Sequence, residues 1–231
     1  MNDVCPHCGA SLAPAEVEVG GRVYRVGTRP CQCDGAKAER AANLAAAEAE
    51  RLEDERLRSL RTRERAGIPL RYREAAHPDA PRLFAALGTH GWYLSGGVGC
   101  GKTHLACAVA NIACDAGWRV RFASGVAMLE AERGSFGQAC DGLAPFIACD
   151  LLVLDDLGKE RPTEWALEQL FRVVDGRYNS MRPTIATSQH GRSELARRLA
   201  RGDSPTAQAI ASRLCQTCEV FEVRGGDRRL A

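Results

Sequence analysis

The architecture expected for this chain follows from eight consecutive residues: Gly96, Gly97, Val98, Gly99, Cys100, Gly101, Lys102 and Thr103. They match the pattern G-x-x-x-x-G-K-[ST] in full. Glycines let the backbone wrap tightly and aim successive N–H groups at phosphate oxygens. Lys102 would add a positive charge at the outer phosphates, and Thr103 would offer a hydroxyl to Mg²⁺. The stretch predicts a phosphate loop for ATP and Mg²⁺; the alternative is a glycine-rich turn that matches by chance.

The residues on either side of this loop suit that interpretation. An apolar strand, Trp92 to Leu94, precedes the loop, and a helix from Lys102 to about Ala116 follows it and ends at Gly117. The positive end of the helix dipole would face the same anion. His104, the next residue of the helix, joins the nucleotide-binding candidates.

A second acidic element lies downstream of the loop. The apolar run Leu151 to Leu154 is followed by Asp155 and Asp156. Asp155 would hold Mg²⁺, and Asp156 stands where many ATPases carry Glu to orient or deprotonate the attacking water. Because Asp is one methylene shorter, we expect slow hydrolysis unless a partner completes the site. A buried strand capped by a polar turn is the alternative.

From about residue 70 onward, short apolar segments alternate with helical ones, which predicts a parallel sheet with helices on both faces. The expected strands are 92–94, 120–123, 151–154, 184–187 and 219–223, and the expected helices are 102–116, 125–134, 163–178, 192–200 and 206–214.

Polar residues at three places in the chain are further candidates for sensing the nucleotide. The strand 184–187 ends in Ser188 and Gln189, where a polar side chain could reach the γ-phosphate; the alternative is an ordinary turn. Arg213 ends the helix 206–214, and Arg228 and Arg229 lie near the C-terminus. An arginine that reaches a neighbouring subunit's γ-phosphate stabilises transition-state charge. Surface arginines are the alternative.

Taken together, these segments resemble the helicase-loader ATPases of the DnaC and DnaI type, a branch of the AAA+ superfamily shared with IstB-like transposition helpers. The resemblance covers roughly residues 66–231. The segments that carry it are Gly67 to Tyr72, the loop 96–103, Leu151 to Gly158, Arg182 to Ser188 and Ala211 to Leu214.

This resemblance implies a five-stranded parallel sheet and ATP-dependent self-assembly into a homo-oligomer. It implies that Arg213 reaches the next subunit's ATP, that Arg229 or Arg228 senses the nucleotide in cis, and that residues 68–72, including Tyr72, lie near adenine. The first polar sensor would be Gln189, where the family usually has Asn. The catalytic candidates are therefore Lys102, Asp155, Asp156, Gln189, Arg213 and Arg229.

The N-terminal residues 1–35 contain two cysteine pairs, Cys5-x-x-Cys8 and Cys31-x-Cys33. Four thiolates in a short segment suffice for a tetrahedral Zn²⁺ site, and metal binding would then supply the folding energy. His7 is a poor substitute ligand because it lies between the first two cysteines. Four free thiols are the alternative. We predict a zinc-binding domain at 1–35, a charged helical linker at 36–66, and the ATPase domain at 67–231.

The overall composition sets limits on the class of protein. The net charge is +2, and the basic residues are 28 arginines and three lysines, a bias we attribute to genomic composition. No apolar run reaches the roughly 20 residues of a membrane span, and the first residues do not resemble a signal peptide. We therefore expect a cytoplasmic protein. The seven remaining cysteines, including Cys140 and Cys215, are expected mostly to be small buried hydrophobes.

The sequence leads to two functional hypotheses. The first is an ATPase that binds the replicative DNA helicase and loads it onto single-stranded DNA. The second is an IstB-like transposition helper that binds duplex DNA and a transposase. A nucleotide-gated adaptor with negligible turnover is a third interpretation, which Asp156 supports in part.

Overall fold

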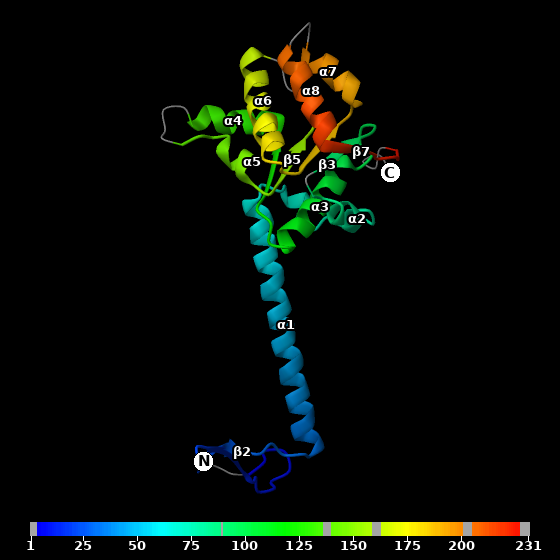
Figure 1. The fold of residues 1–231 in the computed structure, drawn as a ribbon. Coiled ribbons are helices and arrows are strands. Elements are labelled where there is room, and N and C mark those ends of the chain that lie inside the picture. Colours follow the sequence, from blue (N-terminus) through cyan, green and yellow to red (C-terminus); the bar gives the residue numbers. More distant parts are fainter. Residues whose placement is uncertain (1–3, 89, 136–139, 159–162, 201–204, 227–231) are drawn as a thin grey trace. The chain divides into compact units, whose positions relative to one another are not determined.

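The computed structural model describes residues 4–88, 90–135, 140–158, 163–200 and 205–226 (Figure 1). The chain divides into two compact units, Met1–Arg58 and Ser59–Ala231. The division falls within the long helix α1 (Asp34–Arg65), so each unit contains part of this helix. The two units are described separately below.

In the N-terminal unit, a tight cysteine-containing turn is followed by a β-hairpin. Val4 pairs with Ser11 in an isolated bridge that encloses the first cysteine pair. Strands β1 (Pro14–Val19) and β2 (Arg22–Thr28) are antiparallel and are joined at Gly20 and Gly21, which both have positive φ. Nearly all hairpin side chains are exposed, so the hairpin contributes little apolar burial.

Helix α1 is 32 residues long, and Ala36 is its only buried residue. Pairs of opposite charge on its surface, such as Arg56 with Glu53 at 3.7 Å, add modest support. Within the second unit, Arg63 near its end donates to Asp115 at 2.7 Å. No helix in the described part of the chain is long and apolar enough to cross a membrane.

The second unit contains the predicted five-stranded parallel sheet, with strand order β4-β5-β6-β3-β7. The strands are β3 (Gly91–Ser95), β4 (Val120–Ser124), β5 (Leu151–Asp155), β6 (Thr184–Ser188) and β7 (Cys218–Glu222). Because all strands run the same way, their carboxyl ends gather at one edge of the sheet, where ligands usually bind in such folds.

Helices cover both faces of this sheet (Figure 1). They are α2 (Ala80–Ala85), α3 (Lys102–Asp115), α4 (Gly125–Ser135), α5 (Ala144–Ala148), α6 (Glu164–Asn179), α7 (Arg192–Ala200) and α8 (Pro205–Thr217), and a 3₁₀ turn, η1, spans Leu70–Tyr72. The sequence pattern did not predict α2, α5 or η1. Each is six residues or fewer, too short to show a helical period.

Alternate residues of the central strands build two cores. On β5, Leu151 and Val153 join the core formed with α2 and α3, whereas Leu152 and Leu154 join the core formed with α6, α7 and α8. All five β5 residues are buried, which explains why this strand reads as a continuous apolar run.

The interior also contains a charged side chain. Arg177 of α6 is 2% exposed, and burial lowers the pKa of its guanidinium. The guanidinium donates to the Thr184 hydroxyl at 2.9 Å and to the carbonyl oxygens of Cys149 and Pro183, among others. Arg177 therefore ties α6 to the starts of β5 and β6.

The expectation that most of the seven other cysteines are buried is confirmed, because five are buried and two are exposed. Cys100, Cys107, Cys114, Cys149 and Cys218 are buried. Cys140 and Cys215 are exposed, because Cys140 lies outside any helix or strand and Cys215 lies on the outer side of α8.

Candidate nucleotide-binding site and metal centre

The predicted phosphate loop joins the carboxyl end of β3 to the first residue of α3. At two positions of the loop, backbone conformation or close packing requires glycine. Gly101 precedes the helix with φ 100°. Gly96 has φ 155°, and a Cβ there would lie 2.4 Å from the Val223 carbonyl oxygen. Any other residue at these positions would strain or displace the loop.

Lys102 crosses the inside of the loop. Its Nζ donates to the carbonyl oxygens of Gly96 at 2.9 Å and Gly97 at 2.6 Å, and the residue is only 6% exposed. The side chain of Cys100, by contrast, is fully buried in the core next to α3. The ammonium group is thus held within the loop by two of the loop's own carbonyl oxygens.

Thr103 and Asp155, predicted to share Mg²⁺, are in direct contact. The Thr103 hydroxyl donates to Asp155 Oδ1 at 2.9 Å. Thr187, at the end of β6, donates to the same oxygen at 2.7 Å. The parallel register explains this meeting, since Leu154 on β5 faces Ala186 on β6.

Asp156 follows with an unusual backbone conformation. Its φ is 59°, in the left-handed region that few non-glycine residues adopt. Its backbone N–H donates to the Thr187 hydroxyl oxygen at 2.9 Å. Observed strain of this kind is frequent at functional sites.

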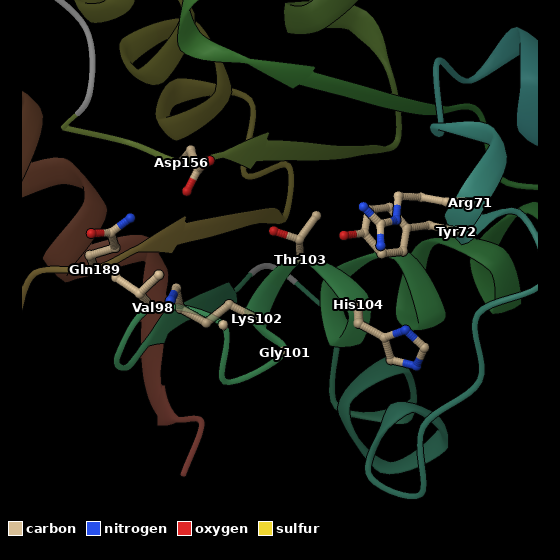
Figure 2. Close-up of a pocket in the computed structure, with 10 residues that line it drawn as sticks. Arg71, Tyr72, Val98, Gly101, Lys102, Thr103, His104, Asp156 and Gln189 are labelled. Atoms are coloured by element: carbon tan, nitrogen blue, oxygen red, sulfur yellow. The ribbon is translucent and has the colours of Figure 1, made fainter. Parts of the chain in front are cut away.

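A cavity of about 310 Å³ lies over the loop. Figure 2 shows Asp156 and Gln189 on one side of Lys102 and Thr103, and Arg71 and Tyr72 on the other. The residues that line it are Arg71, Tyr72, Val98, Gly99, Gly101, Lys102, Thr103, His104, Asp156 and Gln189. The structure thus brings together predicted residues from four separate segments of the chain.

The side of the cavity away from Asp156 is aromatic and basic. The Arg71 guanidinium lies over the Tyr72 ring, 5.2 Å from its centroid. The His104 ring meets the Tyr72 ring edge-on at 6.2 Å. Buried Asn111 of α3 donates to the carbonyl oxygens of Tyr72 and Ala75, which fixes this turn to the helix that begins at the phosphate loop. Flat rings and a guanidinium suit a nucleobase.

Gln189 reaches the cavity, whereas its neighbour Ser188 does not. Ser188 is fully buried and donates to the Leu157 carbonyl oxygen at 2.8 Å. Tyr93 of β3 donates to the His190 carbonyl oxygen at 2.7 Å, and burial raises the pKa of its phenol. The turn that presents Gln189 is therefore anchored on both sides.

Arg213 is placed elsewhere on the same unit. Its Nε donates to Asp175 Oδ1 at 2.5 Å, and its guanidinium lies 4.7 Å from the Phe171 ring centroid and 5.6 Å from that of Tyr178. It does not line the cavity of its own chain. Arg228 and Arg229 lie outside the described residues.

The residues present fit Mg²⁺. A hydroxyl and a carboxylate oxygen, the hard ligands that Mg²⁺ prefers, lie within hydrogen-bond distance of each other beside the loop. Thr103 and Asp155 would hold the ion, Asp155 through water.

The four N-terminal cysteines also come together. Their sulfur atoms all lie within 4.8 Å of one another. Sγ of Cys5 is 3.8 Å from that of Cys33, and Sγ of Cys8 is 3.5 Å from that of Cys31. The backbone N–H groups of Cys8 and His7 lower the pKa of the Cys5 thiol to about 6. Four cysteine sulfurs this close together suit the four-coordinate site that Zn²⁺ prefers.

His7 is not part of this cluster. Its Nε2 lies 2.8 Å from Glu39 Oε2 on α1. This contact agrees with its dismissal as a ligand and connects the cysteine turn to the helix.

Sequence reasoning missed Asn111 and Thr187 as parts of the site. Arg71 lies within the range 68–72 that was expected near adenine, although it was not named on its own. Thr187 was noted only as the end of a strand; the signal was its position beside Asp155 in adjacent parallel strands. Asn111 left no signal other than a polar residue in an apolar helix.

Comparison with known proteins places these features in a family. Residues 90–231, well over half of the chain, match the family model described as IstB-like ATP binding protein. An insertion-sequence IS1162 ATP-binding protein from Pseudomonas fluorescens is 38% identical over 120 residues, which are 47% of this chain and 50% of that protein. The chain thus spans about half the length of this curated relative.

Two solved structures have the same fold. The DnaC helicase loader is 24% identical, with a TM-score of 0.58, over 68% of this chain and 100% of that one. DnaI is 27% identical, with a TM-score of 0.54, over 65% and 80%. The phosphate loop, its acidic partner strand and the family match agree, and the chain belongs to the IstB-like ATP-binding protein family, with the AAA+ fold of the DnaC type.

Proposed function

We propose that this chain hydrolyses ATP weakly and uses its nucleotide state to load a replicative helicase onto single-stranded DNA. The observation that carries the ATPase assignment is the joining of the phosphate loop to Asp155 through Thr103. The loader role rests on the likeness to DnaC and DnaI and on the N-terminal cysteine cluster.

The chain's own residues divide the chemistry between them. Lys102 and the loop amides would bind the β- and γ-phosphates, and Arg71 and Tyr72 would bind the base. Mg²⁺, when bound at Thr103 and Asp155, would offset phosphate charge. Asp156 would orient the attacking water or accept its proton, and Gln189, which lines the cavity, would contact the γ-phosphate.

Two features support weak turnover that depends on assembly. Asp156 has a shorter side chain than the Glu usual at this position. Arg213 of α8 is bound by Asp175 of α6 in the same chain and does not line the cavity of that chain. Arg213 would then act on the nucleotide of the next copy in an ATP-dependent homo-oligomer, where such an arginine is worth about 10³-fold or more in rate.

The nucleotide-binding part of the proposal is tested by calorimetry with nucleotide and Mg²⁺. Lys102→Ala should abolish the binding heat, because the ammonium group and the loop act on the same phosphates. Cys140→Ala, an exposed residue remote from the loop in sequence, is the control and should bind like the wild type. Equal heats for wild type and Lys102→Ala would refute the site.

The loader proposal assigns helicase binding to residues 1–66 and DNA contact to the ATPase unit. A pull-down with the hexameric helicase should recover the full chain. A chain that lacks residues 1–66 should not be recovered with the helicase. Equal recovery of both chains would refute this assignment.

The second candidate is a transposition helper that binds duplex DNA and a transposase. The insertion-sequence relative favours it about as well as the structural neighbours favour a loader. Binding to single-stranded and duplex DNA of the same sequence, measured with ATP at fixed salt, separates the two. Preference for the duplex, with transposase rather than helicase recovered, would establish the alternative.

A further inference from the structure

We propose that Thr187 is a positioning residue that sets both aspartates of the site, Asp155 for Mg²⁺ and Asp156 for the attacking water. The inference rests on the proposed ATP–Mg²⁺ site and adds a residue to it. It starts from one hydroxyl that contacts two consecutive residues at the end of the neighbouring strand.

The hydrogen-bond directions around this hydroxyl are fixed by chemistry. The Asp155 carboxylate can only accept, so the single proton of the Thr187 hydroxyl goes to Asp155 Oδ1, at 2.7 Å. The hydroxyl oxygen is then free to accept from the backbone N–H of Asp156, at 2.9 Å. Thr187 is fully buried, so water does not replace either bond.

One contact orients the Asp155 carboxylate, and the other supports the backbone conformation of Asp156. Asp155 Oδ1 also accepts from Thr103, so the carboxylate is aimed by one hydroxyl from the phosphate loop and one from β6. Asp156 has φ 59°, a left-handed backbone conformation that is strained for a non-glycine residue. The bond to Thr187 helps to hold this conformation, which presents Asp156 to the cavity.

The backbone of Thr187 forms a hydrogen bond to the next residue, Leu157. Its carbonyl oxygen accepts from the Leu157 N–H at 2.9 Å. Three consecutive residues, Asp155 to Leu157, are thus bound to a single residue of β6. Threonine suits the task, because its branched side chain has few rotamers and places the hydroxyl firmly.

The same strand supplies a matched comparison. Thr184 is also buried, at 6% exposed, but its hydroxyl oxygen accepts from Arg177 Nε at 2.9 Å, at the opposite end of the strand. If Thr187 only satisfied buried polar groups, losing either hydroxyl would have the same kind of effect. If Thr187 positions the aspartates, only its loss changes the Mg²⁺ dependence.

The experiment measures ATP affinity as a function of Mg²⁺ concentration, together with thermal unfolding of the nucleotide-free protein. Thr187→Val keeps the shape and removes the hydroxyl; we expect the Mg²⁺ concentration for half-maximal tight binding to rise about ten-fold or more, the scale of losing a bond to a charged group. Thr187→Ser should restore wild-type dependence. Thr184→Val should lower the unfolding temperature and leave the Mg²⁺ dependence unchanged.

Two results would overturn the inference: an unchanged Mg²⁺ dependence in Thr187→Val, or an equal shift in Thr187→Ser. Should Thr187→Val not fold, Thr187→Ala and Thr187→Ser differ only by the hydroxyl and give the same comparison. Lys102→Ala, which should not bind ATP, is measured in the same experiment as the reference for a lost site. If the wild type itself binds no ATP at any Mg²⁺ concentration, the proposed site fails; if it binds and Thr187→Val matches it, only the role of Thr187 fails.

Discussion

In the N-terminal unit, Met1–Arg58, only Cys5 and Ala36 are buried among the described residues, whereas every strand of the sheet in Ser59–Ala231 contributes buried side chains. The second unit gains its stability from apolar burial on both faces of a sheet. The first has four sulfur atoms within 4.8 Å of one another and almost no core. A short segment of this kind needs a cross-link or a metal, so the two units should respond differently to the same perturbations.

The largest effect is expected at the cysteine cluster, where we predict that a structural Zn²⁺ binds. A zinc-selective chelator, or Cys8→Ser, should unfold residues 4–33, because a structural Zn²⁺ supplies on the order of 10 kcal/mol. Amide hydrogen exchange should show lost protection there and unchanged protection in β3 to β7. Cys215→Ser, at an exposed cysteine, is the control. Unchanged exchange in residues 4–33 would show that the comparison is wrong.

The next effect concerns the buried guanidinium of the second unit. Arg177→Met should lower the free energy of unfolding by about 3 kcal/mol or more, because several buried carbonyl oxygens would lose their donor. Denaturant unfolding of the sheet measures it, and metal content should not change. Arg197→Met, at an exposed position on α7, should have little effect. A similar loss in both variants would contradict the assignment.

The same substitution can be made in both units. Val153→Thr, at a fully buried position, should cost about 1–3 kcal/mol because a hydroxyl enters an apolar core. Val17→Thr, where the side chain is 47% exposed in the hairpin, should change stability by no more than about 0.5 kcal/mol. Unfolding followed by probes in each unit checks the pair. Comparable losses would mean that the hairpin has a core of its own.

The smallest expected effect is at the surface of the second unit. Arg119 lies 2.7 Å from Asp150 in an exposed pair, so Arg119→Ala should lower the free energy of unfolding only slightly. The Arg119 hydrogen bond lowers the pKa of Asp150 from its ordinary value of 3.8. The contribution is therefore present above the unfolded pKa and is lost as pH falls through the folded one. Stability of the two proteins should converge in acid; a constant difference would exclude the carboxylate as the cause.

Much of the fold was predictable because its signals are local. The loop at 96–103, the apolar run before Asp155 and the strand from Thr184 each occupy a few consecutive residues, and the structure has all three as expected. The short helix α5 and the turn η1 escaped prediction, since fewer than two helical turns show no period. Cys215 was expected inside because it stands near apolar residues, yet its position on α8 faces outward.

The sequence by itself determined that glycines and a lysine would form a phosphate loop between a strand and a helix, and that four cysteines would be available as ligands. Only the tertiary structure decided which distant groups share an atom. It joined Thr103 and Thr187 at Asp155 Oδ1, and it turned Arg213 toward Asp175 instead of its own cavity. The physical reason is that backbone conformation depends on neighbouring residues in the chain, whereas strand order and helix packing set which side chains meet.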